Sequence, residues 1–216
     1  MIEAIKGHLK TVRASLDTGF QDQPMGLFVR RWLANPRAMG AVTPSTRRLA
    51  EAMAQQTVLA PGEVVVELGP GTGSVTRALV DSGLPEDRLI LIESDPAFQA
   101  YLAEQFPQAT VILGDATRMD RVIPEEWRGK VSTVVSSLPL VALSPRARYR
   151  TVKTAFSVLG RGGRFVQYTY SLFPPMPAAT AGLDSVRVDF IPANLPPASV
   201  WLMTRKRRTA HYRGDA

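Results

Sequence analysis

The 216-residue sequence contains no cysteine and only two histidines, His8 and His211, which lie far apart. Without cysteine the chain can form neither a disulfide framework nor a thiolate metal site. Two distant histidines do not match the spacing of a zinc motif. We therefore expect chemistry that uses neither thiols nor a metal ion.

Long hydrophobic runs are also missing. No apolar stretch approaches the ~20 residues that a membrane-spanning helix needs, although hydrophobic residues make up 45% of the chain. The first residues, Met-Ile-Glu-Ala-Ile-Lys, lack the apolar core and cleavage site of a secretory signal. The sequence therefore predicts one soluble domain located in the cytoplasm.

Acidic residues are outnumbered. There are 26 lysines and arginines against 19 aspartates and glutamates, which gives a net charge of +7 and a pI near 10.1. Such a charge favours an anionic partner, and a lipid surface and a nucleic acid both fit this description.

From about residue 63 onward, short β-branched runs alternate with helical stretches. This alternation predicts βαβ units and an α/β fold with a parallel sheet. The proline-rich segment 192–197 joins two further β-rich runs, which we expect to form an antiparallel pair that closes the sheet. The expected strands are 64–68, 89–93, 110–113, 131–136, 164–168, 185–191 and 199–206, and the expected helices are 74–82, 97–106, 145–158 and a short one at 124–127.

About 60 residues precede this pattern. Pro24 and the pair Asn35-Pro36 divide them into segments 1–22, 25–34 and 44–57, which we predict to be helices. The predicted organisation is therefore an N-terminal helical part, residues 1–57, followed by a main domain, residues 58–216.

A glycine-rich turn is the strongest motif in the chain. Glu67-Leu68-Gly69-Pro70-Gly71-Thr72-Gly73 follows the run Val64–Val66 and precedes a helical stretch. Glycines between a strand and a helix let a ligand approach the amides of the helix N-terminus. The spacing Glu-x-Gly-x-Gly-x-Gly differs from the nicotinamide fingerprint and resembles motif I of the class I S-adenosylmethionine-dependent methyltransferases.

That resemblance implies a Rossmann-like domain with a seven-stranded, mostly parallel sheet whose last strand is antiparallel, and S-adenosylmethionine as cofactor. It also implies that the glycines pass under the methionine part, where Glu67 holds the contacts to the amino end. Glu93, which ends the next strand, would accept the ribose hydroxyls, unless it is merely solvated. Asp115 would lie against the adenine amine, unless it is a plain turn residue. The implied cofactor residues are Thr43, Glu67, Gly69, Gly71, Thr72, Gly73, Glu93, Ser94, Gly114, Asp115, Ala116 and Ser136.

The fourth strand ends in Ser136-Ser137-Leu138-Pro139-Leu140. Enzymes that methylate nitrogen carry a related motif there, whose polar groups bind the target amine. The Leu-Pro pair is similar to that of the ribosomal RNA adenine dimethyltransferases, but Leu140 stands where an aromatic residue would stack on a flipped base. The helical substrate domain of those enzymes has no counterpart here either, so we do not expect a nucleic-acid partner.

Motif I, this Ser-Ser-Leu-Pro-Leu segment, the compact length and the N-terminal helices together resemble the bacterial phospholipid N-methyltransferases of the PmtA type. The resemblance implies methylation of phosphatidylethanolamine, and of its mono- and dimethyl intermediates, toward phosphatidylcholine. It further implies a monomer bound peripherally to the inner face of the cytoplasmic membrane.

The N-terminal segment can be tested against that expectation by helix geometry. At about 100° per residue, Ile2, Ile5, Leu9, Val12 and Leu16 fall within one stripe, and Lys6, Lys10 and Arg13 lie along one side of it. Such a helix suits the headgroup level of an anionic bilayer. The alternative is a helix docked on the protein's own core with its charges in solvent. A second apolar and basic segment with a tryptophan, residues 25–33, favours the membrane.

Methyl transfer needs an aligned, unprotonated amine, and oriented oxygen atoms would position it. The candidate catalytic groups are Ser136, Ser137, the Leu138 carbonyl and Tyr168, with Tyr170 as a neighbour whose face could also hold a methylated cation. A lipid phosphate could be bound by Arg30, Arg31, Arg37 or Arg187, and the run Arg205–Arg208 is a second basic cluster.

Two other functions remain open. An RNA adenine or small-amine methyltransferase would share the fold and differ in acceptor. A non-catalytic membrane-binding module would keep the fold without the chemistry, although the intact glycine-rich turn and Glu93 argue against it.

Overall fold

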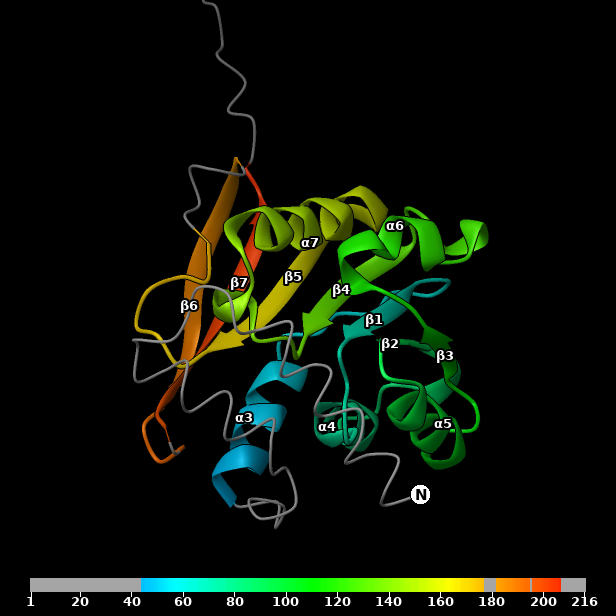
Figure 1. Ribbon diagram of the computed structural model, residues 1–216, viewed down its shortest axis with the longest axis horizontal. Coiled ribbons are helices and arrows are strands. Elements are labelled where there is room, and N and C mark those ends of the chain that lie inside the picture. Colours follow the sequence, from blue (N-terminus) through cyan, green and yellow to red (C-terminus); the bar gives the residue numbers. More distant parts are fainter. Residues whose placement is uncertain (1–43, 177–181, 195, 207–216) are drawn as a thin grey trace, which may run out of the picture.

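The computed structural model describes residues 44–176, 182–194 and 196–206, so the predicted helices over 1–22 and 25–34 lie outside the described residues. Seven strands form one sheet in the order β3-β2-β1-β4-β5-β7-β6 (Figure 1). Neighbouring strands from β3 to β5 are parallel, whereas β7 is antiparallel to both β5 and β6. The strands are β1 (Val64–Leu68), β2 (Leu89–Glu93), β3 (Thr110–Leu113), β4 (Val131–Ser136), β5 (Leu159–Thr169), β6 (Leu183–Ile191) and β7 (Ala198–Arg205).

This arrangement confirms the predicted fold, and β1 to β4 have the predicted bounds. Strand β5 begins five residues earlier than predicted, at Leu159 rather than Arg164. Its first part contains Gly160, Gly162 and Gly163, and the register against β4 shifts between Val131 and Thr133. Strand prediction relies on β-branched and aromatic side chains, which this glycine-rich beginning lacks.

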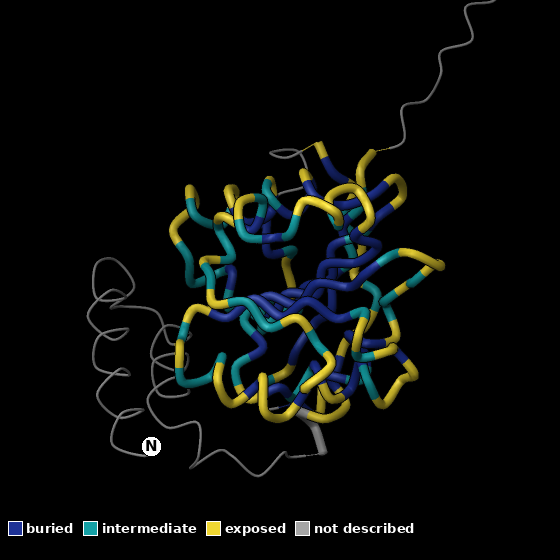
Figure 2. The backbone as a smooth tube through the Cα atoms, turned by 90° about the vertical axis from the view of Figure 1, so that its right-hand side faces the viewer, coloured by how far each residue is buried: buried dark blue, intermediate teal, exposed yellow. Residues whose placement is uncertain are grey.

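Helices cover both faces of the sheet (Figure 1). One face carries α3 (Pro44–Ala54), α4 (Ser74–Asp81) and α5 (Pro96–Gln105), and the other carries α6 (Met119–Val122) and α7 (Pro145–Val158). In Figure 2 the buried strands run through the middle of the molecule and the exposed segments surround them. Four short 3₁₀ turns complete the described elements, namely η1 (Glu86–Arg88), η2 (Ala116–Arg118), η3 (Glu125–Trp127) and η4 (Leu140–Ala142).

Alternation along the strands explains the two layers. In β1, Val64 and Val66 belong to the apolar cluster under α6 and α7, whereas Val65 belongs to the cluster under α3, α4 and α5. Successive side chains of a strand point to opposite faces, so a fully apolar strand needs a helical layer on each side.

Helix α3 is packed on the sheet. Leu49, Ala50 and Met53 are buried in the same cluster as Val65 and Val200. The helix ends at Ala54, three residues earlier than predicted. The division of the chain at residue 57 stays a prediction, because most of the N-terminal part lies outside the described residues.

The start of each larger crossover helix is fixed by a local signal. The Asp95 carboxylate accepts hydrogen bonds from the amides of Ala97 and Phe98, and Pro96 opens α5. Ser144 caps α7 in the same way, and Pro145 opens it. Within the described ranges, no helix is both long and apolar enough to cross a bilayer.

The parallel strands bring their carboxyl ends to one edge of the sheet. We call this edge, marked by Leu68, Glu93, Ser136 and Thr169, the carboxyl rim. In open α/β sheets ligands bind at this edge. The predicted site residues that the structure describes lie near the ends of the strands that form this rim.

Candidate active site

The glycine-rich turn after β1 depends on glycine at three positions. Gly69, Gly71 and Gly73 have φ angles of 64°, 56° and 77°, which L-residues with a side chain rarely adopt. A Cβ atom on Gly69 would lie 2.4 Å from Leu138 Cδ2, and one on Gly73 would lie 2.8 Å from Phe106 Cε2. A Cβ atom on Gly71 would meet no described protein atom within 4 Å. The turn is therefore packed on two sides and open at Gly71.

Glu67 lies just before this turn and is completely buried. Its carboxylate accepts hydrogen bonds from Thr76 Oγ1 at 2.6 Å and from Ser137 Oγ at 3.0 Å. Burial raises the pKa of Glu67 from 4.5 to about 7; the two hydrogen bonds oppose this rise and the nearby Glu93 adds to it. A cation placed here would relieve that penalty, which fits the amino group of a bound methionine moiety.

Glu93 joins the end of β2 to the glycine-rich turn. Its Oε1 accepts from the amides of Ser94 and Asp95 at 2.7 and 3.0 Å, and its Oε2 accepts from the amide of Gly71 at 3.1 Å. The side chain is 6% exposed, so it is held at the rim rather than solvated. A carboxylate fixed in this way can still accept a hydrogen bond from a hydroxyl group on the remaining lone pair of Oε2.

The segment after β3 is partly engaged in its own turn. Asp115 is exposed, and its carboxylate accepts from the Thr117 amide and hydroxyl, both at 2.8 Å. Gly114 is tied to β2 because its amide donates to the Glu93 carbonyl at 2.8 Å. The preceding Leu113 is 52% exposed, an apolar surface at the rim that sequence reasoning did not single out. A contact of Asp115 with adenine stays a prediction.

Ser136, the last residue of β4, and the following Ser137 point to opposite sides of the sheet. Ser137 reaches Glu67, whereas Ser136 is buried and its Oγ has no hydrogen-bond partner among the described residues. The structure thus brings Ser137, not Ser136, to the buried carboxylate. This separation follows from the alternation of side chains along a strand.

Gln167 is the residue that sequence reasoning missed. It pairs with Ser136 across β4 and β5 and is completely buried. Its Nε2 donates to the Leu138 carbonyl at 2.9 Å and to the Tyr168 carbonyl at 2.7 Å, and its Oε1 has no partner in the described part of the chain. Gln167 therefore orients the backbone of the predicted acceptor segment. A polar residue within an otherwise apolar strand was the only feature of the sequence that could have indicated Gln167.

Tyr168 and Tyr170 lie together on the face covered by α3 and α4. Their ring centroids are 5.5 Å apart in an edge-to-face arrangement, and their hydroxyls interact. Burial raises the pKa of both phenols, so each stays protonated near neutral pH. Tyr168 is thus a hydrogen-bonding or packing group rather than a base.

Other predicted site residues lie outside the described residues or apart from Glu67 and Ser137. Thr43 and the predicted membrane-binding residues Ile2, Ile5, Lys6, Leu9, Lys10, Val12 and Arg13 lie outside the described residues, as do Arg30, Arg31 and Arg37. Thr72 and Ser94 are exposed at the rim, and Ala116 is partly buried. Arg187 stacks on Phe190 on β6, with its guanidinium carbon 5.7 Å from the ring centroid.

Arg205 has a structural role. Its guanidinium donates to the carbonyls of Phe156, Leu159 and Gly160, where α7 ends and β5 begins. This contact satisfies carbonyls that a helix end leaves without partners. The first residue of the predicted basic cluster is therefore occupied inside the molecule.

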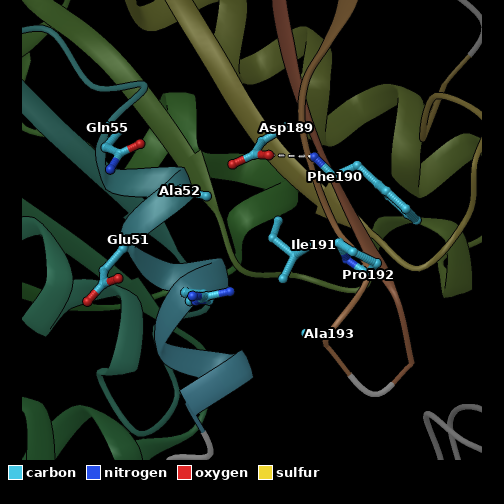
Figure 3. Close-up of a pocket in the computed structure, with 9 residues that line it drawn as sticks. Glu51, Ala52, Gln55, Asp189, Phe190, Ile191, Pro192 and Ala193 are labelled. Carbon is cyan, nitrogen blue, oxygen red and sulfur yellow. Dashed lines mark hydrogen bonds between the residues drawn. The ribbon is translucent and has the colours of Figure 1, made fainter.

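The pocket shown in Figure 3 lies between α3 and the end of β6. Its volume is about 270 Å³, and its lining includes Arg48, Glu51 and Gln55 from the helix and Asp189 and Pro192 from the opposite side. None of the residues predicted for the cofactor or the acceptor lines it. Among the described residues there is also no cluster of side chains suited to a metal ion.

Known proteins share part of this sequence and its fold. No family model matches the chain. An ornithine lipid N-methyltransferase of Singulisphaera acidiphila is 28% identical over 178 residues, which cover 81% of this chain and 93% of that protein. A ribosomal RNA small subunit methyltransferase A of Phenylobacterium zucineum is 38% identical over 81 residues, which cover only 36% of this chain and 27% of that protein.

A solved structure shows the fold. The glycopeptide N-methyltransferase MtfA, complexed with S-adenosylmethionine, superposes with a TM-score of 0.58 at 15% identity and covers 74% of this chain and 87% of its own. The chain therefore has the fold of this S-adenosylmethionine-binding methyltransferase, and most of its length is similar in sequence to a lipid N-methyltransferase.

Proposed function

We propose that the protein methylates the amine of phosphatidylethanolamine, and of its mono- and dimethyl intermediates, toward phosphatidylcholine at the inner surface of the cytoplasmic membrane. The similarity to a lipid N-methyltransferase, which extends over 93% of that relative, is the observation that carries the proposal. Ornithine and ethanolamine headgroups both offer a primary amine next to an anionic group. The basic chain and its predicted amphipathic N-terminus suit such a surface.

The cofactor would be held along the carboxyl rim. The turn with Gly69, Gly71 and Gly73 would pass under the methionine part with its open side at Gly71, Glu67 would meet the ammonium group, and Glu93 would accept from the ribose hydroxyls. Thr72, Ser94 and the segment Gly114–Ala116 would complete the contacts. When bound, S-adenosylmethionine supplies an electrophilic methyl group next to a positively charged sulfur.

The amine would be bound at the end of β4. Ser137 donates its only hydroxyl proton to Glu67, so its oxygen is left to accept from an amine. The predicted Leu138 carbonyl already accepts from Gln167 Nε2 and from the Leu140 amide, so its part in this proposal is to hold the segment beside Ser137 in place. Removal of water from this segment lowers the pKa of a primary ammonium and favours the neutral form that has a lone pair. Tyr168 stays a proposed neighbour that packs against the acceptor.

Methyl incorporation from labelled S-adenosylmethionine tests the proposal. The acceptors are vesicles of phosphatidylethanolamine, vesicles of an ornithine lipid, and ribosomal RNA. We expect saturable incorporation into phosphatidylethanolamine. Incorporation only into the ornithine lipid would keep lipid methylation and overturn the substrate assignment.

An RNA acceptor is the second candidate, because several relatives named ribosomal RNA small subunit methyltransferase A match part of the chain. The matching segments span 26% to 31% of those three proteins. Leu140 is buried and offers no ring for a base. Methyl incorporation into RNA and none into either lipid would favour this candidate and overturn the lipid proposal.

A further inference from the structure

The loop that follows β5 presents two large apolar side chains to solvent at the carboxyl rim. Leu172 is 62% exposed and Phe173 is 77% exposed, the highest values for large hydrophobic residues in the described part. We call residues Ser171–Met176 the rim loop. Single exposed apolar residues are ordinary, but two adjacent ones beside a binding edge indicate a contact surface.

Hydrogen bonds fix the rim loop in this position. The Ser171 amide donates to Thr169 Oγ1 at 3.0 Å, and the Phe173 amide donates to Ser171 Oγ at 3.1 Å. Arg148 of α7 donates through Nη1 to the Pro175 carbonyl at 3.1 Å, and through Nε to the Leu140 carbonyl at 2.9 Å. The apolar pair is therefore part of a preformed projection, tied to the segment that follows β4.

The helix that holds the rim loop is positively charged. Helix α7 contains three arginines and one lysine and no acidic residue. Arg146 and Arg150 are exposed and lie one turn apart on α7, whose first turns are on the same side of the molecule as the rim loop (Figure 1). Tyr149, between them in sequence, is 41% exposed. Apolar residues beside arginine and tyrosine are typical of an interfacial contact with a membrane.

We propose that the rim loop inserts Leu172 and Phe173 into the surface of an anionic lipid bilayer, with Arg146 and Arg150 near the headgroup phosphates. The charge of this region complements such a surface, and the inserted loop would turn the carboxyl rim toward the lipid. This inference deepens the proposed function and rests on it for its purpose. It needs no contact from the N-terminal segment.

A single fluorescent label tests the insertion. Because the chain has no cysteine, Phe173→Cys in the full-length protein gives one site for an environment-sensitive dye. Val186→Cys is the matched control, since Val186 is a 59% exposed apolar residue on β6. With vesicles of phosphatidylglycerol and phosphatidylethanolamine, we expect a blue shift at position 173 only. No shift at 173, or the same shift at both positions, would overturn the proposal.

Phe173→Asp separates membrane contact from catalysis. We expect vesicle cosedimentation to fall roughly tenfold or more, because an inserted apolar side chain is replaced by a charge. Methylation of phosphatidylethanolamine dispersed in detergent should be unchanged. If that activity falls as well, Phe173 belongs to the acceptor site and the membrane role is wrong.

The two proposals can fail separately. Insertion of the label without methylation of dispersed lipid by the wild type would support the rim loop and reject the substrate. Methylation of dispersed lipid without insertion would support the proposed substrate and overturn the rim-loop proposal. Saturable binding of RNA that protects the label from quenching, with no vesicle binding, would also overturn the rim-loop proposal.

Discussion

Glu67 is a carboxyl group whose environment disfavours its own charge. It is completely buried, and its pKa is raised from 4.5 to about 7. A carboxyl whose pKa is higher in the folded state binds more protons there than in the unfolded state. Stability therefore falls as pH rises from about 4.5 to about 7 and stays low above that range. This loss of stability arises at the position where we propose that a cationic part of the cofactor binds.

Glu67→Gln should remove that cost. We expect the apo protein to become more stable at pH 8 by about 2 kcal/mol, a rise in Tm of roughly 5 °C. The difference from wild type should shrink toward pH 5, where the wild-type carboxyl is protonated in the folded state. The same variant should bind S-adenosylhomocysteine at least roughly tenfold more weakly, since one charge-assisted contact is lost. Thermal unfolding at both pH values checks the stability, and calorimetry checks the affinity. An equal Tm of wild type and variant at pH 8 would contradict the cost of the buried charge.

Gln167 is a positioning residue whose effect should be confined to turnover. Gln167→Met keeps the volume of this buried side chain but removes both hydrogen bonds to the Leu138 and Tyr168 carbonyls. We expect kcat to fall roughly tenfold, while the affinity for S-adenosylhomocysteine is unchanged. A parallel loss of Tm, affinity and kcat would instead show a purely structural role, and an unchanged kcat would exclude the residue from acceptor alignment.

The glycine-rich turn separates cofactor binding from folding. Gly71 and Gly73 both have positive φ angles, so alanine at either position is strained by roughly 1 kcal/mol. Only the new methyl of Gly73→Ala would also collide with Phe106.

We therefore expect Gly71→Ala to lower the affinity for S-adenosylhomocysteine at least roughly tenfold with a small loss of stability. Gly73→Ala should lose about 2 to 3 kcal/mol of stability. Chemical denaturation and calorimetry on both variants check the pair. Normal cofactor binding by Gly71→Ala would show that the ligand does not approach this turn.

The elements also show what local sequence patterns can and cannot reveal. Strands β1 to β4 are short apolar runs bounded by turn residues, and such runs predict their own bounds. The four-residue helix α6 is too short to show a helical period, and it was not predicted. The contacts of Gln167 join neighbouring strands that are distant in sequence, so spacing along the chain could not reveal them. Glu67, Gly69, Gly71 and Gly73 could be predicted as candidates because their motif is local, and Glu93 because it ends the next predicted strand.

The molecule as a whole is proposed to present one face to a membrane. The predicted helix of residues 1–22 would contribute an apolar stripe to this face. The described domain would contribute the carboxyl rim. Ile5→Asp combined with Leu9→Asp should lower cosedimentation with anionic vesicles roughly tenfold or more.

Thr11→Asp combined with Ala14→Asp is the matched control. It adds the same charge on the opposite side of the predicted helix, at about 100° per residue. We expect this control to keep most of the binding. Equal loss in both variants would indicate a general charge effect and contradict the stripe.

Mass spectrometry of the lipid itself tests the central claim most directly. Phosphatidylethanolamine vesicles are incubated with the purified full-length protein and S-adenosylmethionine, and the headgroup masses are followed over time. We expect stepwise gain of methyl groups on the headgroup nitrogen, and a slower gain in Gly71→Ala at a limiting concentration of S-adenosylmethionine. An unchanged lipid beside a methylated RNA or soluble amine would contradict the account.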